Sequence, residues 1–265
     1  MSTIAQPGDG APDTPHTAIP AAESTSQDPI ELSGAAAKGA DSSKQADSEP
    51  ATGAEAVAEM IGVGPWEGTW PQGEQWDPEL LAEGDRRNVI DEFRYWRHDA
   101  IVAALDERRH EFHVAIENWQ HDLNIGSVVR TANAFLAKEV HIIGRRRWNR
   151  RGAMVTDKYQ HVRHHPTVED FVNWAAEEGV VVIGIDNFPD SVPLESYPLP
   201  SKCVLVFGQE GPGLTPEVHQ AAEATLSIAQ YGSTRSINAS AAAAIAMHAW
   251  IRRYEFGQRV SGSAP

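Results

Sequence analysis

The chain has 265 residues, a formal net charge of −15 and a single cysteine, Cys203. One cysteine excludes an internal disulfide framework and a cysteine-rich metal site, and no apolar run reaches the length of a membrane span. The negative net charge does not exclude a nucleic-acid partner, because it is concentrated at one end of the chain. Residues 1–85 carry 16 acidic and 2 basic side chains, whereas residues 86–265 carry 21 acidic and 20 basic ones. The first residues show no basic region followed by an apolar stretch, which a signal peptide would have. We therefore expect a cytoplasmic protein.

Residues 1–60 are expected to form a disordered acidic tail. They are dominated by small and polar residues and contain no Trp, Tyr or Phe, so they cannot bury enough apolar surface to offset the loss of chain entropy. Residues 61–110 follow as an N-terminal helical extension. Its first part is irregular and rich in tryptophan, and a helical pattern of apolar residues runs from Asp77 to Leu105.

Between residues 111 and 257 short apolar runs alternate with amphipathic stretches. The runs predict strands at His113–Glu117, Val140–Ile143, Val180–Ile185, Cys203–Phe207 and Leu226–Ile228. The amphipathic stretches predict helices at Ile125–Phe135, Thr167–Glu178, Thr215–Ala224 and Ser236–Tyr254. This alternation predicts an α/β fold with a mainly parallel sheet and helices on both faces. Residues 258–265 are expected to be a flexible C-terminus.

Three segments carry the candidate chemistry. In the first, Asn124 precedes Arg130 by six positions at the start of a predicted helix. In the second, three glycines follow the buried strand that ends at Phe207. In the third, a polar loop leads through Ser236 and Asn238 into an Ala-rich helix. The alanines of 239–244 predict close packing against another backbone, either within the fold or across a dimer.

Each segment also has a plain structural interpretation. Glycines after a buried strand place a sharp turn at the carboxyl edge of a parallel sheet, where ligands bind. Their spacing fits neither a dinucleotide fold nor a phosphate loop, and an ordinary turn would explain them too. Asn124 and Asn238 are good helix N-caps, Ser236 fits a helix start, and Arg130 could be a surface charge.

Taken together, the three segments resemble the SpoU/TrmH family of SPOUT methyltransferases. That family has an Asn-(five residues)-Arg motif, then Gly-x-Glu-x-x-Gly, then a motif with Ser-Leu-Asn, and this chain has all three in order between Phe112 and Arg253. Two departures stand out. Ala229-Gln230 replaces the usual Pro-Met, and Ser-Ile-Asn-Ala-Ser replaces Ser-Leu-Asn-Val-Ser.

The resemblance implies an S-adenosylmethionine-dependent transfer of a methyl group to a ribose 2′-hydroxyl of structured RNA, either tRNA or rRNA. It also implies a deep C-terminal trefoil knot and a homodimer whose sites are completed across the interface. The implied catalytic residues are Asn124, Arg130, Glu210, Ser236 and Asn238, and those implied to contact the donor are Ile185, Gly208, Ile228 and Ile237. Because arginine stays protonated in proteins, we expect Arg130 to stabilise the developing alkoxide or the adjacent phosphate.

A basic segment follows the predicted strand that ends at Ile143. It contains Arg145, Arg146, Arg147, Trp148, Arg150 and Arg151. Arginines contact phosphates and tryptophan stacks on exposed bases, so the segment is expected to bind RNA, with a solvated basic loop as the alternative. His161, His164 and His165 are interpreted as loop or RNA-facing residues, because no acid or cysteine cluster supports a metal site. No metal is expected.

Three rival functions stay open at this point, of which a generic nucleotide-binding module is the most distant. A base methyltransferase from another SPOUT branch would use different motif residues, so the first and third segments argue against it. A non-catalytic RNA-binding or assembly factor that retains the knotted fold is supported only by the altered pair Ala229-Gln230. Binding of S-adenosylmethionine would distinguish this factor from an enzyme.

Overall fold

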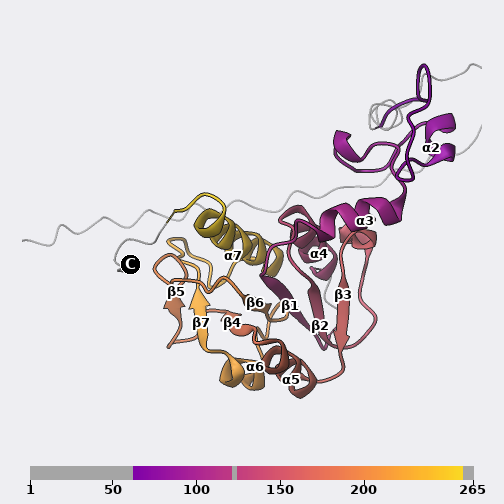
Figure 1. Ribbon diagram of the computed structural model, residues 1–265. Helices are drawn as coiled ribbons and strands as arrows, with labels where there is room; N and C mark the ends of the chain where they lie inside the picture. The colour runs from indigo at the N-terminus through magenta and orange to yellow at the C-terminus, as the bar shows by residue number, and fades with distance from the viewer. Residues whose placement is uncertain (1–61, 121–123, 259–265) are drawn as a thin grey trace, which may run out of the picture. The chain divides into compact units, whose positions relative to one another are not determined.

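The computed structural model describes residues 62–120 and 124–258 (Figure 1). The expected disordered tail, residues 1–60, and all but the first residue of the expected flexible C-terminus lie outside these ranges. Within them, no helix has both the length and the apolar character that a membrane crossing requires.

One seven-stranded sheet organises the chain, in the order β3-β2-β1-β6-β4-β7-β5. The strands are β1 (His113–Asn118), β2 (Val140–Gly144), β3 (Val162–His165), β4 (Val181–Ile185), β5 (Val192–Pro193), β6 (Cys203–Phe207) and β7 (Ala224–Ser227). All six neighbouring pairs run parallel. The predicted parallel α/β fold is therefore confirmed, with the wholly buried strand β6 at the centre.

Helices cover both faces of the sheet, as predicted (Figure 1). On one face lie α4 (Ile125–Ala134) and α7 (Ala239–Tyr254), and on the other lie α5 (Val168–Glu178) and α6 (Pro216–Ala221). Because side chains alternate along a strand, Val114 and Ile116 of β1 pack in the first layer and Ala115 in the second. The buried Ala243 and Ala246 pack with α4, so part of the alanine run is used within the fold.

Local capping explains where several helices begin. Thr167 and Asp170 form a capping box that starts α5. The Asn238 side chain caps α7 by accepting a hydrogen bond from Ser240 N at 2.9 Å, so this helix begins later than predicted. The helix that starts after Thr215 is shorter than predicted, because α6 ends at Ala221 and the chain enters β7 three residues later.

The extension forms separate short helices rather than one continuous helical stretch. These are α2 (Pro78–Glu83), the 3-10 turn η1 (Asp91–Phe93) and α3 (His98–Asp106). Between them the fully buried carboxylate of Asp85 accepts hydrogen bonds from the Arg87 guanidinium at 2.7 and 2.9 Å and from Tyr95 N at 2.9 Å. A buried charge needs such partners, and arranging them around Asp85 interrupts the helical path.

Strand β3 corrects the interpretation of two histidines. His164 and His165 are not loop residues but belong to this strand at one edge of the sheet, and His165 is only 5% exposed. The Nε2 of His165 lies 2.9 Å from the Nδ1 of His141. Only His161, just before the strand, is an exposed loop residue, and it contacts Asp106 at 2.8 Å. β3 was not predicted, because only strands buried on both faces form a continuous apolar run and β3 lies at the edge of the sheet.

Burial keeps the histidines on this side of the sheet neutral. It lowers the pKa of His113 and that of His165 to about 4, and the pKa of His141 falls well below its ordinary value for the same reason. Nearby cations such as Lys138 and Arg163 act in the same direction. The three imidazoles are therefore uncharged at neutral pH.

Candidate functional site

A cavity of about 240 Å³ opens at the carboxyl ends of β4, β6 and β7. Its walls include all four residues implied to contact the donor and three of those implied to act in catalysis: Ile185, Gly208, Ile228, Ile237, Glu210, Ser236 and Asn238. Segments that are far apart in the sequence thus meet at the edge where open α/β sheets bind ligands. Of the predicted donor-binding and catalytic residues, only Asn124 and Arg130 do not line the cavity.

Two glycines of the turn after β6, Gly208 and Gly213, have no room for a side chain. A Cβ atom on Gly208 would lie 2.0 Å from the carbonyl carbon of Gly213. Gln209 and Gly213 exchange backbone hydrogen bonds of 3.1 and 3.0 Å across this turn. Gly213 has φ +74°, and a Cβ there would lie 2.3 Å from the Asp186 carboxylate. That carboxylate accepts a hydrogen bond from Leu214 N at 2.8 Å, which ties the turn to the end of β4.

A buried glutamate that the sequence analysis missed holds the other side of this turn. Glu117, near the end of β1, has no exposed surface. One of its carboxylate oxygens accepts a hydrogen bond from Thr215 N at 2.8 Å. The other accepts from Thr215 Oγ1 at 2.8 Å and from Trp119 Nε1 at 2.9 Å. Because Thr215 also caps α6, Glu117 fixes the path from the glycine turn into that helix.

Three residues from the three sequence motifs form one hydrogen-bonded row. Asn124 Nδ2 donates to Glu210 Oε2 at 2.7 Å, and Asn238 Nδ2 donates to Asn124 Oδ1 at 2.9 Å. Asn124 makes no side-chain cap on α4, although its position before the helix suggested one. Asn238 has both roles, since its Oδ1 caps α7. The row reaches the surface through Glu210 and Asn238, which are exposed.

Arg130 lies apart from this row within its own chain. It is an exposed residue of α4 and does not line the cavity. It follows Asn124 by six positions, and a helix that turns about 100° per residue places the two side chains in different directions. In the described part of the chain, no hydrogen bond or ion pair involves its guanidinium.

The basic segment, residues 145–151, is exposed but its backbone is fixed. All five of its arginines are exposed, whereas Trp148 is half-buried against the hydrophobic core. Asn118, at the end of β1, donates hydrogen bonds to the carbonyl oxygens of Arg145 at 2.7 Å and Arg147 at 3.0 Å. The Arg150 guanidinium lies 5.4 Å from the centre of the Trp148 ring.

The start of α4 packs closely against the end of this segment. A Cβ atom on Gly126 would lie 2.8 Å from Ala153 N and 2.9 Å from Asn149 O. Gly126 is two positions after Asn124. The basic segment and the row of motif residues are therefore held on neighbouring parts of the fold.

A model of the SpoU rRNA Methylase family matches residues 111–248, just over half of the chain. The chain belongs to this family. Membership confirms the resemblance found in the sequence and the predicted class of enzyme, an RNA methyltransferase.

Curated relatives each match just over half of the chain. The chain is 25% identical over 156 residues to the tRNA (guanosine(18)-2′-O)-methyltransferase of Borreliella burgdorferi, covering 58% of this chain and 72% of the relative. It is 24% identical over 155 residues to the Escherichia coli K12 protein of the same name, covering 57% and 68%. An uncharacterized tRNA/rRNA methyltransferase of Mycobacterium marinum is 29% identical over 162 residues, and the chain spans about half of its length (51%).

Two solved structures share the fold. The A. aeolicus TrmH/SpoU tRNA modifying enzyme superposes with a TM-score of 0.54 at 23% identity, covering 63% of this chain and 88% of that one. The SpoU methyltransferase AviRb from Streptomyces viridochromogenes, in complex with the cofactor AdoMet, gives 0.51 at 21% identity, covering 57% and 60%.

Proposed function

We propose that this protein binds S-adenosylmethionine in the cavity at the carboxyl ends of β4, β6 and β7 and methylates a ribose 2′-hydroxyl of a tRNA or rRNA. The observation that carries this proposal is the meeting of the second and third sequence motifs on one cavity, joined to the first motif through Asn124. Residues 111–257 would form the catalytic domain and residues 61–110 an extension to it.

The cavity fits the methyl donor in shape and chemistry. Ile185, Ile228 and Ile237 supply apolar walls for an adenine ring, and the lack of a side chain at Gly208 leaves backbone groups within reach of a ligand. Gln230, which stands where the family usually has methionine, also lines the cavity, and its buried Oε1 has no hydrogen-bond partner among the residues that the structure describes. A ligand amino group would satisfy this oxygen.

The donor supplies an electrophilic methyl group, and the residues of the protein position and polarise the hydroxyl that accepts it. Arg130 stays protonated, so we assign it to stabilising the developing alkoxide or the adjacent phosphate. The proton then passes to a phosphate oxygen or to water. Glu210 and Asn238, linked through Asn124, orient the guanidinium, and Ser236 positions the ribose.

This role for Arg130 requires a second copy of the chain. Its side chain does not reach the cavity of its own chain, so we propose a homodimer in which Arg130 of one protomer faces the cavity of the other. A two-fold contact of this kind forms two equivalent sites. We also propose that the segment carrying Ile228 and Ile237 belongs to a C-terminal trefoil knot, supported by family membership and by its place beside the turn after β6.

RNA would be held mainly by the basic segment. Its five arginines are exposed, and the hydrogen bonds from Asn118 fix their backbone beside the start of α4. The described part of the extension is acidic by comparison, with 11 acidic and 6 basic side chains in residues 62–110. Phosphate contacts come from arginine and lysine, so the basic segment rather than the extension is the main candidate. We expect Trp148 to contribute to stacking less than the arginines do to charge, since its ring already packs on the core.

The direct test supplies the purified full-length protein with S-adenosylmethionine carrying a labelled methyl group and with total tRNA and rRNA. We expect labelled RNA that, after complete alkaline digestion, leaves the label in dinucleotides, because a 2′-O-methyl group blocks cleavage of the next phosphodiester. Ile237→Asp places a charge in the donor cavity and should abolish both donor binding and transfer. Label confined to the bases, or donor binding unchanged in Ile237→Asp, would contradict the proposal.

A further inference from the structure

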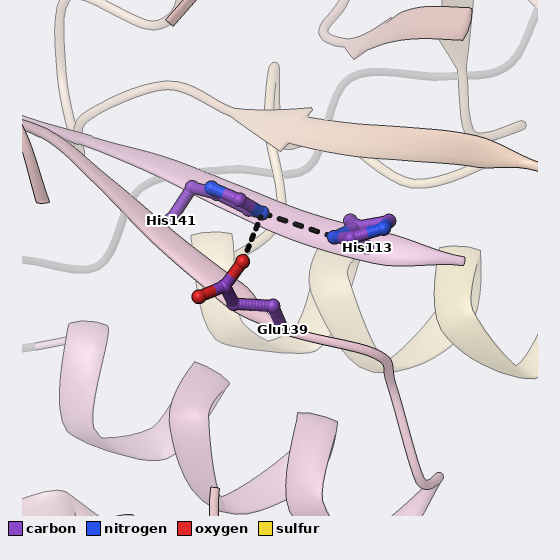
Figure 2. Close-up of side chains that lie close together, drawn as sticks. All are labelled: His113, Glu139 and His141. Carbon is purple, nitrogen blue, oxygen red and sulfur yellow. Dashed lines mark hydrogen bonds and ion pairs between the residues drawn. The ribbon is translucent and has the colours of Figure 1, made fainter. Parts of the chain in front are cut away.

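A second cluster of chemically competent side chains lies away from the cavity, near the amino ends of β1 and β2. It consists of His113, Glu139 and His141, and in Figure 2 dashed lines join His141 to each of the other two. The His113 Nδ1 and the His141 Nε2 are 3.0 Å apart, and the His141 Nε2 is 3.8 Å from the nearer Glu139 oxygen. One ligand atom from each of the three residues lies within 4.8 Å of the other two. His113 is 7% exposed and His141 fully buried.

Hydrogen bonds among these three residues account for only part of this arrangement, although His165 and Arg163 bond to the outer sides of His141 and Glu139. The two imidazoles satisfy one another, but a separation of 3.8 Å is too long for a hydrogen bond from His141 to Glu139. The carboxylate nevertheless points at the same nitrogen that faces His113 (Figure 2). Three polar groups thus converge on one point while only one pair is bonded, which is the arrangement that ligands take around an ion.

We propose that His113, Glu139 and His141 bind one Zn²⁺ ion, with water in a fourth position. Two imidazoles and a carboxylate form a known three-ligand set for zinc. Tetrahedral coordination at usual Zn–N and Zn–O lengths places ligand atoms roughly 3.3–3.4 Å apart. Two of the three separations, 3.0 and 3.8 Å, bracket this value, and the third, between His113 and Glu139, is no longer than 4.8 Å, so side-chain movements would bring the three ligand atoms around one ion. The proposal departs from the expectation of no metal.

Residues that contact the proposed ligands from outside the cluster also support a zinc site. Ligating histidines commonly bond through their second nitrogen, and ligating carboxylates are in turn hydrogen-bonded. Here the second nitrogen of His141 lies 2.9 Å from His165 Nε2, and the Glu139 carboxylate is held by the Arg163 guanidinium at 3.1 Å. The Trp174 ring covers His141 with its centre 3.9 Å from that of the imidazole.

The position of this zinc site, away from the donor cavity, indicates a structural role, although catalytic zinc sites use the same ligand set. The ion would link the start of β1 to β2, and His165 would extend the connection to the edge strand β3. The donor cavity lies at the opposite ends of the strands, among β4, β6 and β7. Zinc should therefore stabilise the fold without taking part in methyl transfer.

The test uses full-length protein that has been treated with a chelator and dialysed. Zn²⁺ affinity is measured by competition with a chromogenic chelator, and Co²⁺ is added separately to detect the visible absorption of a tetrahedral site. We expect one Zn²⁺ per chain and an affinity at least ~10-fold weaker in both His141→Gln and Glu139→Gln. His161→Gln, which changes an exposed histidine outside the cluster, should bind as the wild type does.

Glu139→Gln keeps the inference testable if His141→Gln does not fold, because Glu139 is only partly buried (18% exposed). Absence of saturable zinc binding to the wild type, or equal affinity in the wild type and both variants, would overturn the inference. Binding of S-adenosylmethionine, measured in the same samples by calorimetry, should be the same with and without zinc. The zinc site and the proposed methyltransferase function can therefore fail independently.

Discussion

Polar side chains are exposed at one end of the sheet and buried at the other. At the carboxyl ends of β4, β6 and β7, Glu210 and Asn238 are exposed beside a cavity and are linked through Asn124. Near the amino ends of β1 and β2, His113 and His141 are buried. Strands that lead into glycine turns leave room for a ligand, whereas strand starts covered by a helix are packed. Changes at the first end should therefore alter ligand binding, and changes at the second should alter stability.

Glu117 combines features of both ends of the sheet. It sits toward the carboxyl end of β1 but is fully buried, and it accepts two hydrogen bonds from Thr215, which follows the glycine turn, and one from Trp119. Its burial makes it part of the packed core, and its position places it beside the proposed donor cavity. Its substitution should therefore affect both stability and donor binding.

Removing Trp174 should have the largest effect on stability. The ring is 7% exposed and contacts His113, His141 and His165, so Trp174→Ala should lower the free energy of unfolding by about 3–5 kcal/mol. The affinity for S-adenosylmethionine in the folded fraction should not change. Urea unfolding and calorimetry measure the two quantities.

Trp70→Ala is the matched control for this change. Trp70 is 43% exposed, and its replacement should alter stability by no more than about 0.5 kcal/mol. If Trp174→Ala weakened donor binding while leaving stability intact, the division between the two ends of the sheet would be wrong.

Glu117→Gln should have a smaller effect on stability, but it should also weaken the binding of S-adenosylmethionine. The amide NH₂ would face donors that now bond to a carboxylate, and leaving them unsatisfied costs about 1–3 kcal/mol of unfolding free energy. The turn at Gly208 would loosen, so the Kd for S-adenosylmethionine should rise several-fold. Glu217→Gln, at an exposed acidic residue in the first turn of α6, serves as control and should change neither. Unchanged donor affinity in Glu117→Gln would limit the role of this residue to folding.

The sequence predicted the central elements of the fold better than the edges. Cys203–Phe207 was predicted with the bounds that the structure shows, because a strand buried on both faces is a continuous apolar run. The edge strand β3 and the two-residue β5 were missed, since neither is such a run. The helical pattern before residue 106 was interrupted by the buried ion pair of Asp85, which periodicity does not reveal.

Only those residues of the candidate site that belong to sequence motifs could be predicted from the sequence. The three motifs placed Gly208, Glu210 and Asn238, and the structure brings these to one cavity. Glu117 was not found, because it contacts Thr215 from 98 positions away and a lone glutamate at the end of a strand has no local signal. The zinc ligands were missed for the same reason, as Glu139 and His141 meet His113 only when β1 and β2 pair.

Mixing two inactive variants tests the central claim most directly. Arg130→Ala should bind S-adenosylmethionine but not transfer methyl groups, and Ile237→Asp should bind none. If Arg130 completes the cavity of the partner protomer, refolding the two chains together in equal amounts should restore roughly a quarter of the wild-type rate, because half of the dimers are mixed and each contains one complete site. No activity above that of the separate variants, although mixed dimers form, would contradict a site built from the Arg130 of one protomer and the donor cavity of the other.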